Sequence, residues 1–253
     1  MRHRLVTRTI IVFGLFCAQA SPRVVQSTTQ AIVQQSQSQS QSKAPTQTTS
    51  VFAGGSDSAV SRTVGHAEGT RTPNGSKTRA YYGHSDPGNG VWNLGSFSYQ
   101  HGAASPEAAD EKQLKRLERQ TANLLAIAKQ FRVTLTLEEK LNGIDLANQA
   151  PLAALGAKGY IERLAQAKQR GLHGDAAILW ARTQAYWDPQ RNRWDAPGLG
   201  NTEDNIRHDQ ERRLLAIARA LIIYRQQNSG VKLVSANPMR DHFWRWFEFV
   251  EKG

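Results

Sequence analysis

Helix signals recur through most of the second half of the chain, and this pattern constrains the fold more than any other feature. Apolar residues return at three- and four-residue steps over about 105–131, 136–149 and 202–228. The interval 70–102 is different, because glycine, proline, asparagine and serine punctuate short apolar and aromatic runs there. The sequence therefore predicts an α+β fold, mostly α, in which a helical domain carries a small β-hairpin lobe.

Two helix starts are especially clear. Ser105 has the character of an N-cap, and Pro106 and Glu107 follow it in the first turn. Thr136 and Glu139 form a capping-box pattern. Further helices are expected near 57–67, 157–170, 176–187 and 202–228, and from Asn237 towards the C-terminus, with Asp57, Asp175 and Thr202 as caps. The residues expected to face the core are Val60, Val64, Ala67, Leu114, Leu117, Thr121, Leu124, Ala128, Phe131, Leu137, Leu141, Ile144, Ile206, Gln210, Leu214, Ile217, Leu221 and Tyr224.

The hairpin is expected between two aromatic runs. Asp86-Pro87-Gly88-Asn89-Gly90 is a turn sequence, and Arg79–Tyr82 and Val91–Tyr99 flank it. We expect extended segments on both sides of this turn. The aromatic side chains of the lobe suit either its core or a platform for sugar rings.

The first twenty residues have the three parts of a secretory signal peptide. A basic start precedes an apolar run over 9–17, and Ala18-Gln19-Ala20 is an A-x-A cleavage site. We expect cleavage after Ala20 and a secreted or periplasmic protein, with an uncleaved anchor as the alternative. Cys17, the only cysteine, falls in this segment, so the mature chain would contain no disulfide.

A Ser/Thr/Gln-rich stretch over 21–54 follows the signal-like segment. It has too few apolar residues to offset the entropy of ordering, which predicts a disordered tether. The remaining 199 residues, 55–253, are enough for one domain with a sizeable core.

The charge of the chain is positive but not concentrated. Of the net charge of +11, the five basic residues before residue 55 contribute +5, and the rest is interleaved in sign. This distribution indicates a mild attraction to anionic polymers such as cell-wall glycans and no nucleic-acid binding. We expect a monomer without stable membrane insertion after signal cleavage.

Glu68 is the leading candidate for chemistry. It ends the helix expected over 57–67, Gly69 follows, and the chain then enters the hairpin lobe. A carboxyl at such a junction would be partly buried, which disfavours its charged form and makes a general acid available near neutral pH. A glycosidic bond needs such a proton donor for its leaving oxygen. The alternative is a solvated charge at a helix end.

Several short motifs resemble those of phage-type lysozymes and related muramidases. Ala67-Glu68-Gly69-Thr70, followed by Tyr81-Tyr82-Gly83-His84, is similar to the E-G … G-Y-G-H pattern of that family. The likeness continues in order through 105–109, 133–139 and 141–149, and it spans about 57–150.

This resemblance implies a lysozyme-like fold, peptidoglycan or another amino-sugar polymer as substrate, and Glu68 as the catalytic acid. Members of that family carry an aspartate and then a threonine in the hairpin that follows the glutamate. In this sequence Asn74 and Thr78 lie near those two positions, but the spacing differs and the aspartate is missing. The enzyme would be a muramidase or a lytic transglycosylase. Lytic transglycosylases share the fold, and in them a hydroxyl of the sugar itself attacks and forms a cyclic product. The substrate-binding candidates are Asn74, Thr78, Tyr82, His84, Asp86, Trp92, Gln100, His101 and Asn148.

Other readings of these residues remain open. His84, Asp86 and His101 are possible metal ligands, but no further cluster completes a site by spacing, and neither a metal nor a cofactor is expected. The loop from Trp187 to Asn201 is expected to be a structural turn, since the calcium-loop pattern is absent, and its two tryptophans can line a cleft. The aromatic C-terminal helix would close the core or meet a membrane surface. The alternative function is a catalytically silent envelope protein that binds glycan or a protein partner.

Overall fold

The computed structural model describes residues 50–86 and 88–229. The expected signal peptide, the tether up to residue 49, Pro87 and the expected aromatic helix from Asn237 lie outside the described residues. The chain divides into two units, Met1–Thr46 and Gln47–Gly253, and the described residues all belong to the second.

The described part is mostly helical. Its elements, in chain order, are η1 (Gly55–Asp57), α1 (Ala59–Ala67), η2 (Arg79–Tyr82), β1 (His84–Ser85), β2 (Trp92–Asn93), α2 (Pro106–Gln130), α3 (Leu137–Gln149), α4 (Pro151–Leu155), α5 (Tyr160–Gln169), α6 (Gly174–Gln184), β3 (Trp187–Asp188), β4 (Arg193–Trp194), η3 (Pro197–Leu199) and α7 (Glu203–Ser229), where η marks a 3₁₀-helix. The strands form two antiparallel pairs, β1–β2 and β3–β4. The predicted fold class, α+β and mostly α, is confirmed.

The two helix N-termini that the sequence predicts most clearly form as expected. Ser105 Oγ accepts a hydrogen bond from the Ala108 amide at 3.1 Å, with Pro106 in the first turn of α2. Thr136 and Glu139 complete the capping box of α3 through bonds of 2.9 and 3.1 Å.

Two expected caps are wrong. Ser58 caps α1, because its hydroxyl accepts from the Ser61 amide at 3.1 Å, whereas Asp57 belongs to η1. Helix α6 begins at Gly174, so Asp175 lies inside its first turn rather than before it.

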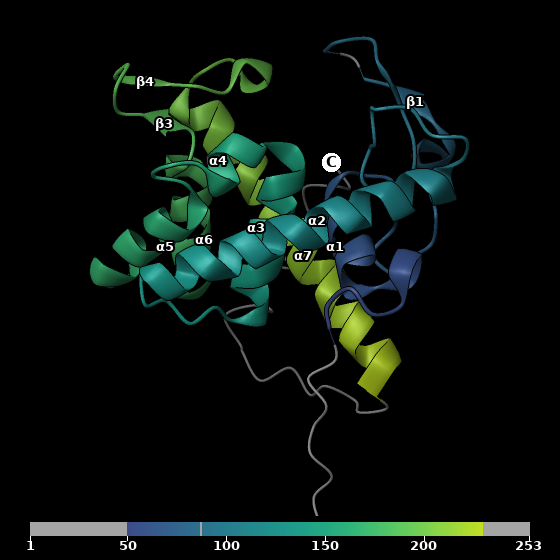
Figure 1. Cartoon of the computed structure of the whole chain (residues 1–253), viewed down its shortest axis with the longest axis horizontal. Helices are drawn as coiled ribbons and strands as arrows, with labels where there is room; N and C mark the ends of the chain where they lie inside the picture. Colours follow the sequence, from purple (N-terminus) through teal and green to yellow (C-terminus); the bar gives the residue numbers. More distant parts are fainter. Residues whose placement is uncertain (1–49, 87, 230–253) are drawn as a thin grey trace, which may run out of the picture. The chain divides into compact units, whose positions relative to one another are not determined.

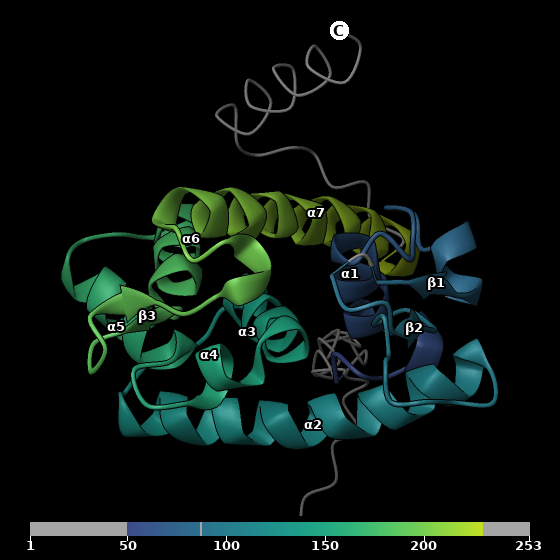
Figure 2. The same ribbon diagram turned by 90° about the horizontal axis from the view of Figure 1, so that it is seen from above.

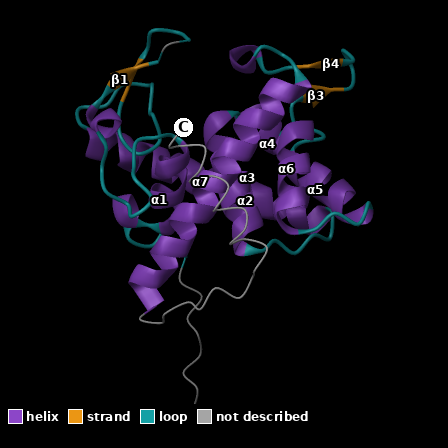
Figure 3. Cartoon of the chain, turned by 180° about the vertical axis from the view of Figure 1, so that it is seen from behind, coloured by secondary structure: helices purple, strands orange, loops and turns teal. Residues whose placement is uncertain are grey.

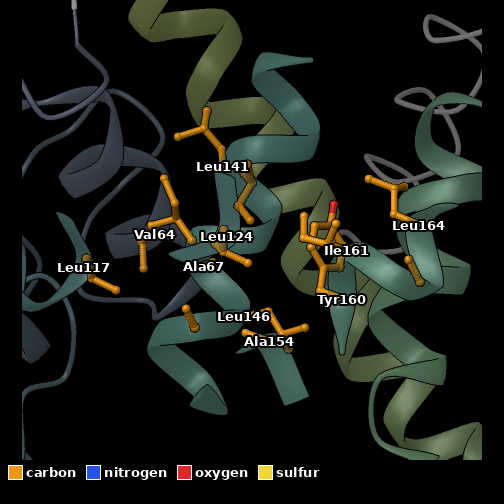
Figure 4. Close-up of a cluster of buried hydrophobic side chains, with 14 of the residues drawn as sticks. Val64, Ala67, Leu117, Leu124, Leu141, Leu146, Ala154, Tyr160, Ile161 and Leu164 are labelled. Carbon is orange, nitrogen blue, oxygen red and sulfur yellow. The ribbon is translucent and has the colours of Figure 1, made fainter. Parts of the chain in front are cut away.

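The core is built from buried residues of helices α1 to α7. Figure 2 shows α2 and α7, the two longest helices, along opposite sides of the unit, with α1 and α3 between them. Val64 and Ala67 of α1 face Leu117 and Leu124 of α2 in the core close-up of Figure 4. The expected inward stripes are largely confirmed, except that Phe131 is exposed because α2 has already ended at Gln130.

The first hairpin is shorter than expected. His84 pairs with Asn93 and Ser85 with Trp92, and the Asp86–Gly90 turn connects them. The predicted extended run Arg79–Tyr82 is wrong, since these residues form η2. The fully buried Tyr81 explains this, because its hydroxyl donates to Glu107 Oε1 at 3.1 Å and draws the segment against α2.

A second hairpin occupies the loop that was expected to be only a turn. Trp187 pairs with Trp194, and their rings meet edge to face with centroids 5.1 Å apart. Asp188 Oδ1 accepts from the amides of Gln190 and Arg191 at 2.9 and 3.1 Å, which fixes the turn. In Figures 1 and 3 the two hairpins project on the same side of the helices, at opposite ends.

The folded unit includes residues that were assigned to the tether. Val51 and Phe52 pack against the core, and the Val60 amide donates to the Val51 carbonyl at 3.2 Å. Packing therefore begins a few residues before the expected boundary at residue 55. Among the described helices, none combines the length and apolar character that a membrane crossing requires.

Candidate active site

Glu68 stands at the C-terminal end of α1. Its amide still donates to the Val64 carbonyl at 2.9 Å, and Gly69 turns the chain away with φ +77°. Arg212 of α7 donates to the Ala67 carbonyl at 3.0 Å and satisfies one of the free carbonyls at this helix end. The side chain of Glu68 is therefore presented from a fixed backbone.

The carboxylate of Glu68 is held by two other helices. Asn148 Nδ2 at the end of α3 donates to Oε1 at 2.9 Å, and Arg213 Nη2 of α7 donates to the same oxygen at 2.6 Å. The side chain is still 15% exposed. Within the described residues, Oε2 accepts no hydrogen bond, so one oxygen is anchored and the other is unengaged.

Asp145 lies behind Arg213, and it is completely buried. Arg213 donates to both of its oxygens, from Nε to Oδ2 at 2.9 Å and from Nη2 to Oδ1 at 2.7 Å. Arg182 of α6, equally buried, donates to Oδ2 at 2.7 Å. Burial alone would raise the pKa of Asp145, but the charges and hydrogen bonds of Arg213 and Arg182 lower it below the ordinary value. We call Glu68, Asp145, Arg182 and Arg213 the charge cluster.

The charge cluster changes the expected electrostatics of Glu68. The sequence argument considered burial alone, whereas the structure adds a cationic donor, Arg213, and an amide donor, Asn148, at Oε1. Burial opposes the charge of Arg213, but Asp145 and Glu68 together raise its pKa well above the ordinary value, so the guanidinium is permanently charged. Since Asp145 binds Arg213 through two hydrogen bonds, Arg213 keeps its position independently of Glu68.

Asn148, which was expected to bind substrate, contacts Glu68 itself. Gln113 Nε2 of α2 donates to Asn148 Oδ1 at 2.7 Å, which directs the amide nitrogen of Asn148 towards Glu68. The same nitrogen also reaches the Phe97 carbonyl at 3.3 Å. The hairpin lobe, α2 and α3 therefore meet at this amide.

Thr78 also lies beside the site, whereas Asn74 does not. Thr78 Oγ1 donates to the Gly69 carbonyl at 2.9 Å, directly after Glu68. Asn74 closes a turn by accepting from the Ser76 amide at 3.1 Å, and its own carbonyl lies 3.4 Å from the amide of Gln227. Gln227 is about 21 Å along α7 from Arg213 at 1.5 Å per residue. Asn74 therefore lies away from Glu68, and its role in substrate binding stays a prediction.

Four further candidates lie on the hairpin that we call the arm, residues 82–93. His84 Nδ1 is 3.0 Å from the Ala80 carbonyl, and Asp86 Oδ1 accepts from the amides of Gly88 and Asn89. These contacts give both side chains a structural role. Tyr82 and Trp92 instead expose 62% and 57% of their surface.

Gln100 and His101 lie just after the arm. Gln100 Oε1 accepts from Asn89 at 3.4 Å, and the His101 ring lies 3.3 Å from Arg116 and edge to face with Tyr99. In the part of the chain that the structure describes, no three His, Cys, Asp or Glu side chains come together as metal ligands would.

Several residues around the site were not anticipated from the sequence. Gln149, next to Asn148, donates to Asp209 Oδ2 at 2.7 Å and accepts from the Tyr186 hydroxyl at 3.1 Å. Tyr186 also lines a groove of about 530 Å³ between α4 and β3. A signal for Arg213 and Asp145 exists, because both fall among apolar residues on the buried stripes of their helices, where a charge requires a partner.

Comparison with family models, curated proteins and solved structures finds no match to this chain. The function must therefore be inferred from the residues of the site.

Proposed function

We propose that this protein cleaves the glycan of peptidoglycan and that Glu68 is the general acid. One observation carries the proposal. Glu68 has one carboxylate oxygen fixed by Asn148 and Arg213, while the side chain is still 15% exposed. General acid catalysis depends first on such positioning, because the donor must reach the leaving oxygen at hydrogen-bond distance.

Four other carboxylates of the described chain lack this combination. Asp145 and Asp110 are almost completely buried and are bonded within the protein. Asp86 and Asp188 each use one oxygen to close a hairpin turn. Glu68 differs from these four because it is held from behind and partly open in front.

The reaction begins with transfer of a proton from Glu68 to the glycosidic oxygen as the bond to the anomeric carbon breaks. Substrate that covers Glu68 excludes water from the site of this transfer. Arg213 remains bound to Asp145 both before and after this proton transfer. Attack by water on the anomeric carbon gives hydrolysis, and attack by the sugar's own hydroxyl gives an anhydro product. In either case the proton of the attacking group passes to the Glu68 carboxylate, which restores the acid.

A catalytically silent glycan-binding protein is the second candidate, and one observation favours it. Arg213 Nη2 lies 2.6 Å from Glu68 Oε1, so Glu68 is also placed to act as a structural counter-charge to a buried guanidinium. In that case the cluster would serve folding alone and the exposed aromatics of the arm would bind glycan.

Purified peptidoglycan distinguishes these candidates. The wild-type protein, Glu68→Gln and the surface control Glu118→Gln are incubated with it, and soluble fragments are separated and identified by mass spectrometry. We expect fragments from the wild type and the control but not from Glu68→Gln. Products with reducing ends indicate hydrolysis, and anhydro products indicate transglycosylation. A folded wild type that releases no fragments would leave the binding protein as the better account.

A further inference from the structure

The arm, residues 82–93, carries an unusual concentration of exposed apolar surface. Of the six large apolar residues that are exposed in the described part of the chain, three lie on the arm, namely Tyr82, Val91 and Trp92. Single exposed apolar residues need no explanation, but a cluster of them on a projecting element is typical of a binding surface.

Trp92 is held in a defined orientation. Its backbone pairs with Ser85, and its ring lies against Gly83, where an added β-carbon would collide with the indole. Gly83 also has φ +139°, a backbone conformation that favours glycine. One side of the indole is therefore packed against the chain while much of the remainder faces solvent, so little entropy is lost when a ligand stacks on it.

The turn beneath Trp92 is ordered by side-chain hydrogen bonds rather than by a core. Asp86 Oδ1 accepts from the amides of Gly88 and Asn89 at 2.7 and 3.2 Å. Asn89 Oδ1 accepts from the Val91 amide at 2.9 Å, and its nitrogen reaches Gln100 at 3.4 Å. The buried Tyr81 anchors the base of the arm, because its carbonyl accepts from the Gly95 amide at 2.9 Å. The arm is thus a preformed surface.

The chemistry of the arm indicates its ligand. The arm itself contains no lysine or arginine, so it offers phosphates and acidic peptides neither of these cations, and Arg79 lies just before its base. The acid Asp86 is engaged in the turn. The hydroxyl of Ser85 and the amides of Asn89 and Gln100 lie on or next to the arm. A pyranose ring offers an apolar face of C–H groups and a rim of hydroxyls, which suits this combination.

We infer that the arm is a carbohydrate platform on which Trp92, assisted by Tyr82, stacks against a pyranose ring of an N-acetylated amino-sugar polymer. Only the identity of the polymer rests on the proposed function. The platform itself requires no chemistry at Glu68.

The test measures binding in the full chain with Glu68→Gln, which prevents cleavage. A soluble N-acetylglucosamine oligomer is titrated by calorimetry into this protein and into versions that add Trp92→Ala, Trp92→Phe or Leu152→Ala. Leu152 is 87% exposed on α4 and controls for loss of exposed apolar surface. We expect Trp92→Ala to weaken binding about tenfold, as truncation of an aromatic anchor does, with Phe restoring part of the loss and Leu152→Ala having no effect.

A further variant separates the presence of the indole from its orientation. Gly83→Ala keeps Trp92 in the chain but displaces its ring. We therefore expect a lower affinity for the oligomer although the indole is still present. The melting temperature of Trp92→Ala should stay close to that of its parent, since more than half of the side chain is already exposed. Equal affinities for Trp92→Ala and Leu152→Ala would overturn the platform. A dimer in sedimentation that Trp92→Ala abolishes would also overturn it, in favour of a second copy of the chain.

Failure of the platform and failure of the proposed function are distinguishable. If the wild type does not cut peptidoglycan but Glu68→Gln binds the oligomer through Trp92, the proposed function fails and the platform stands. If the wild type cuts peptidoglycan while Trp92→Ala retains its affinity and KM, the platform fails and the proposed function stands.

Discussion

The arm and the charge cluster are ordered by opposite means. The arm is held by hydrogen bonds between residues close in the sequence, from two positions apart for Asp86 and Gly88 to eleven for Asn89 and Gln100. In the charge cluster, Asp145 bonds Arg182 and Arg213 across separations of 37 and 68 residues, and Glu68 bonds Arg213 across 145. Removal of one partner therefore has local consequences in the arm, whereas removal of Asp145 leaves buried charges unpaired in the cluster.

The largest effect is expected at Asp145. Asp145→Ala leaves the buried guanidiniums of Arg182 and Arg213 without their shared counter-charge, and breaking a buried pair in this way costs about 3–5 kcal/mol of unfolding free energy. Urea unfolding followed by circular dichroism measures the change. The surface variant Glu118→Ala serves as the control and should stay within about 0.5 kcal/mol of the wild type. A similarly small loss in Asp145→Ala would show that the cluster contributes little to folding.

Acid should weaken the same cluster. Arg213 and Arg182 overcome the effect of burial and lower the pKa of Asp145, so the folded chain keeps this group ionised at pH values where the unfolded chain protonates it. The unfolded state then binds more protons, and the free energy of unfolding falls as the pH drops below the ordinary value of 3.8. Urea midpoints between pH 7 and pH 3 test this. Asp145→Asn should be less stable at pH 7 and lose less on acidification, and equal losses in both proteins would contradict the assignment.

The smallest effect is expected in the arm. Asp86→Ala removes the side-chain oxygen that accepts from two backbone amides of the turn. Because these amides can donate to water instead, the free energy of unfolding should fall by only about 0.5–1.5 kcal/mol. Hydrogen exchange should show faster exchange confined to the arm, with unchanged protection in α3 and α7. Faster exchange throughout those helices would remove the contrast between the two regions.

These differences also explain which features could be predicted from the sequence. Ser105, Thr136 and the Asp86–Gly90 turn act through neighbours within three or four residues, and all three form as expected. The segment Arg79–Tyr82 was expected to be extended but is helical, since the contact between Tyr81 and Glu107 depends on a helix 26 residues away. Local patterns do not contain such a contact.

The candidate site was predictable only in part. Glu68 and Asn148 were named together because short motifs resembled a known family, and the structure brings them to 2.9 Å. Arg213 and Asp145 were overlooked because helical periodicity places a residue on a buried face without naming its partner. Asn74 was assigned by approximate spacing, and spacing does not show that its turn faces the far end of α7.

The most direct test of the central claim is the ratio of kcat/KM between the wild type and Glu68→Gln on a defined soluble peptidoglycan fragment. Glutamine keeps the size of the side chain and its acceptor for Asn148 but has no transferable proton. We expect kcat/KM to fall by about 10²–10⁴-fold, with binding of the fragment retained and the melting temperature changed little. A Glu68→Gln protein as active as the wild type would contradict the role of Glu68 as the general acid.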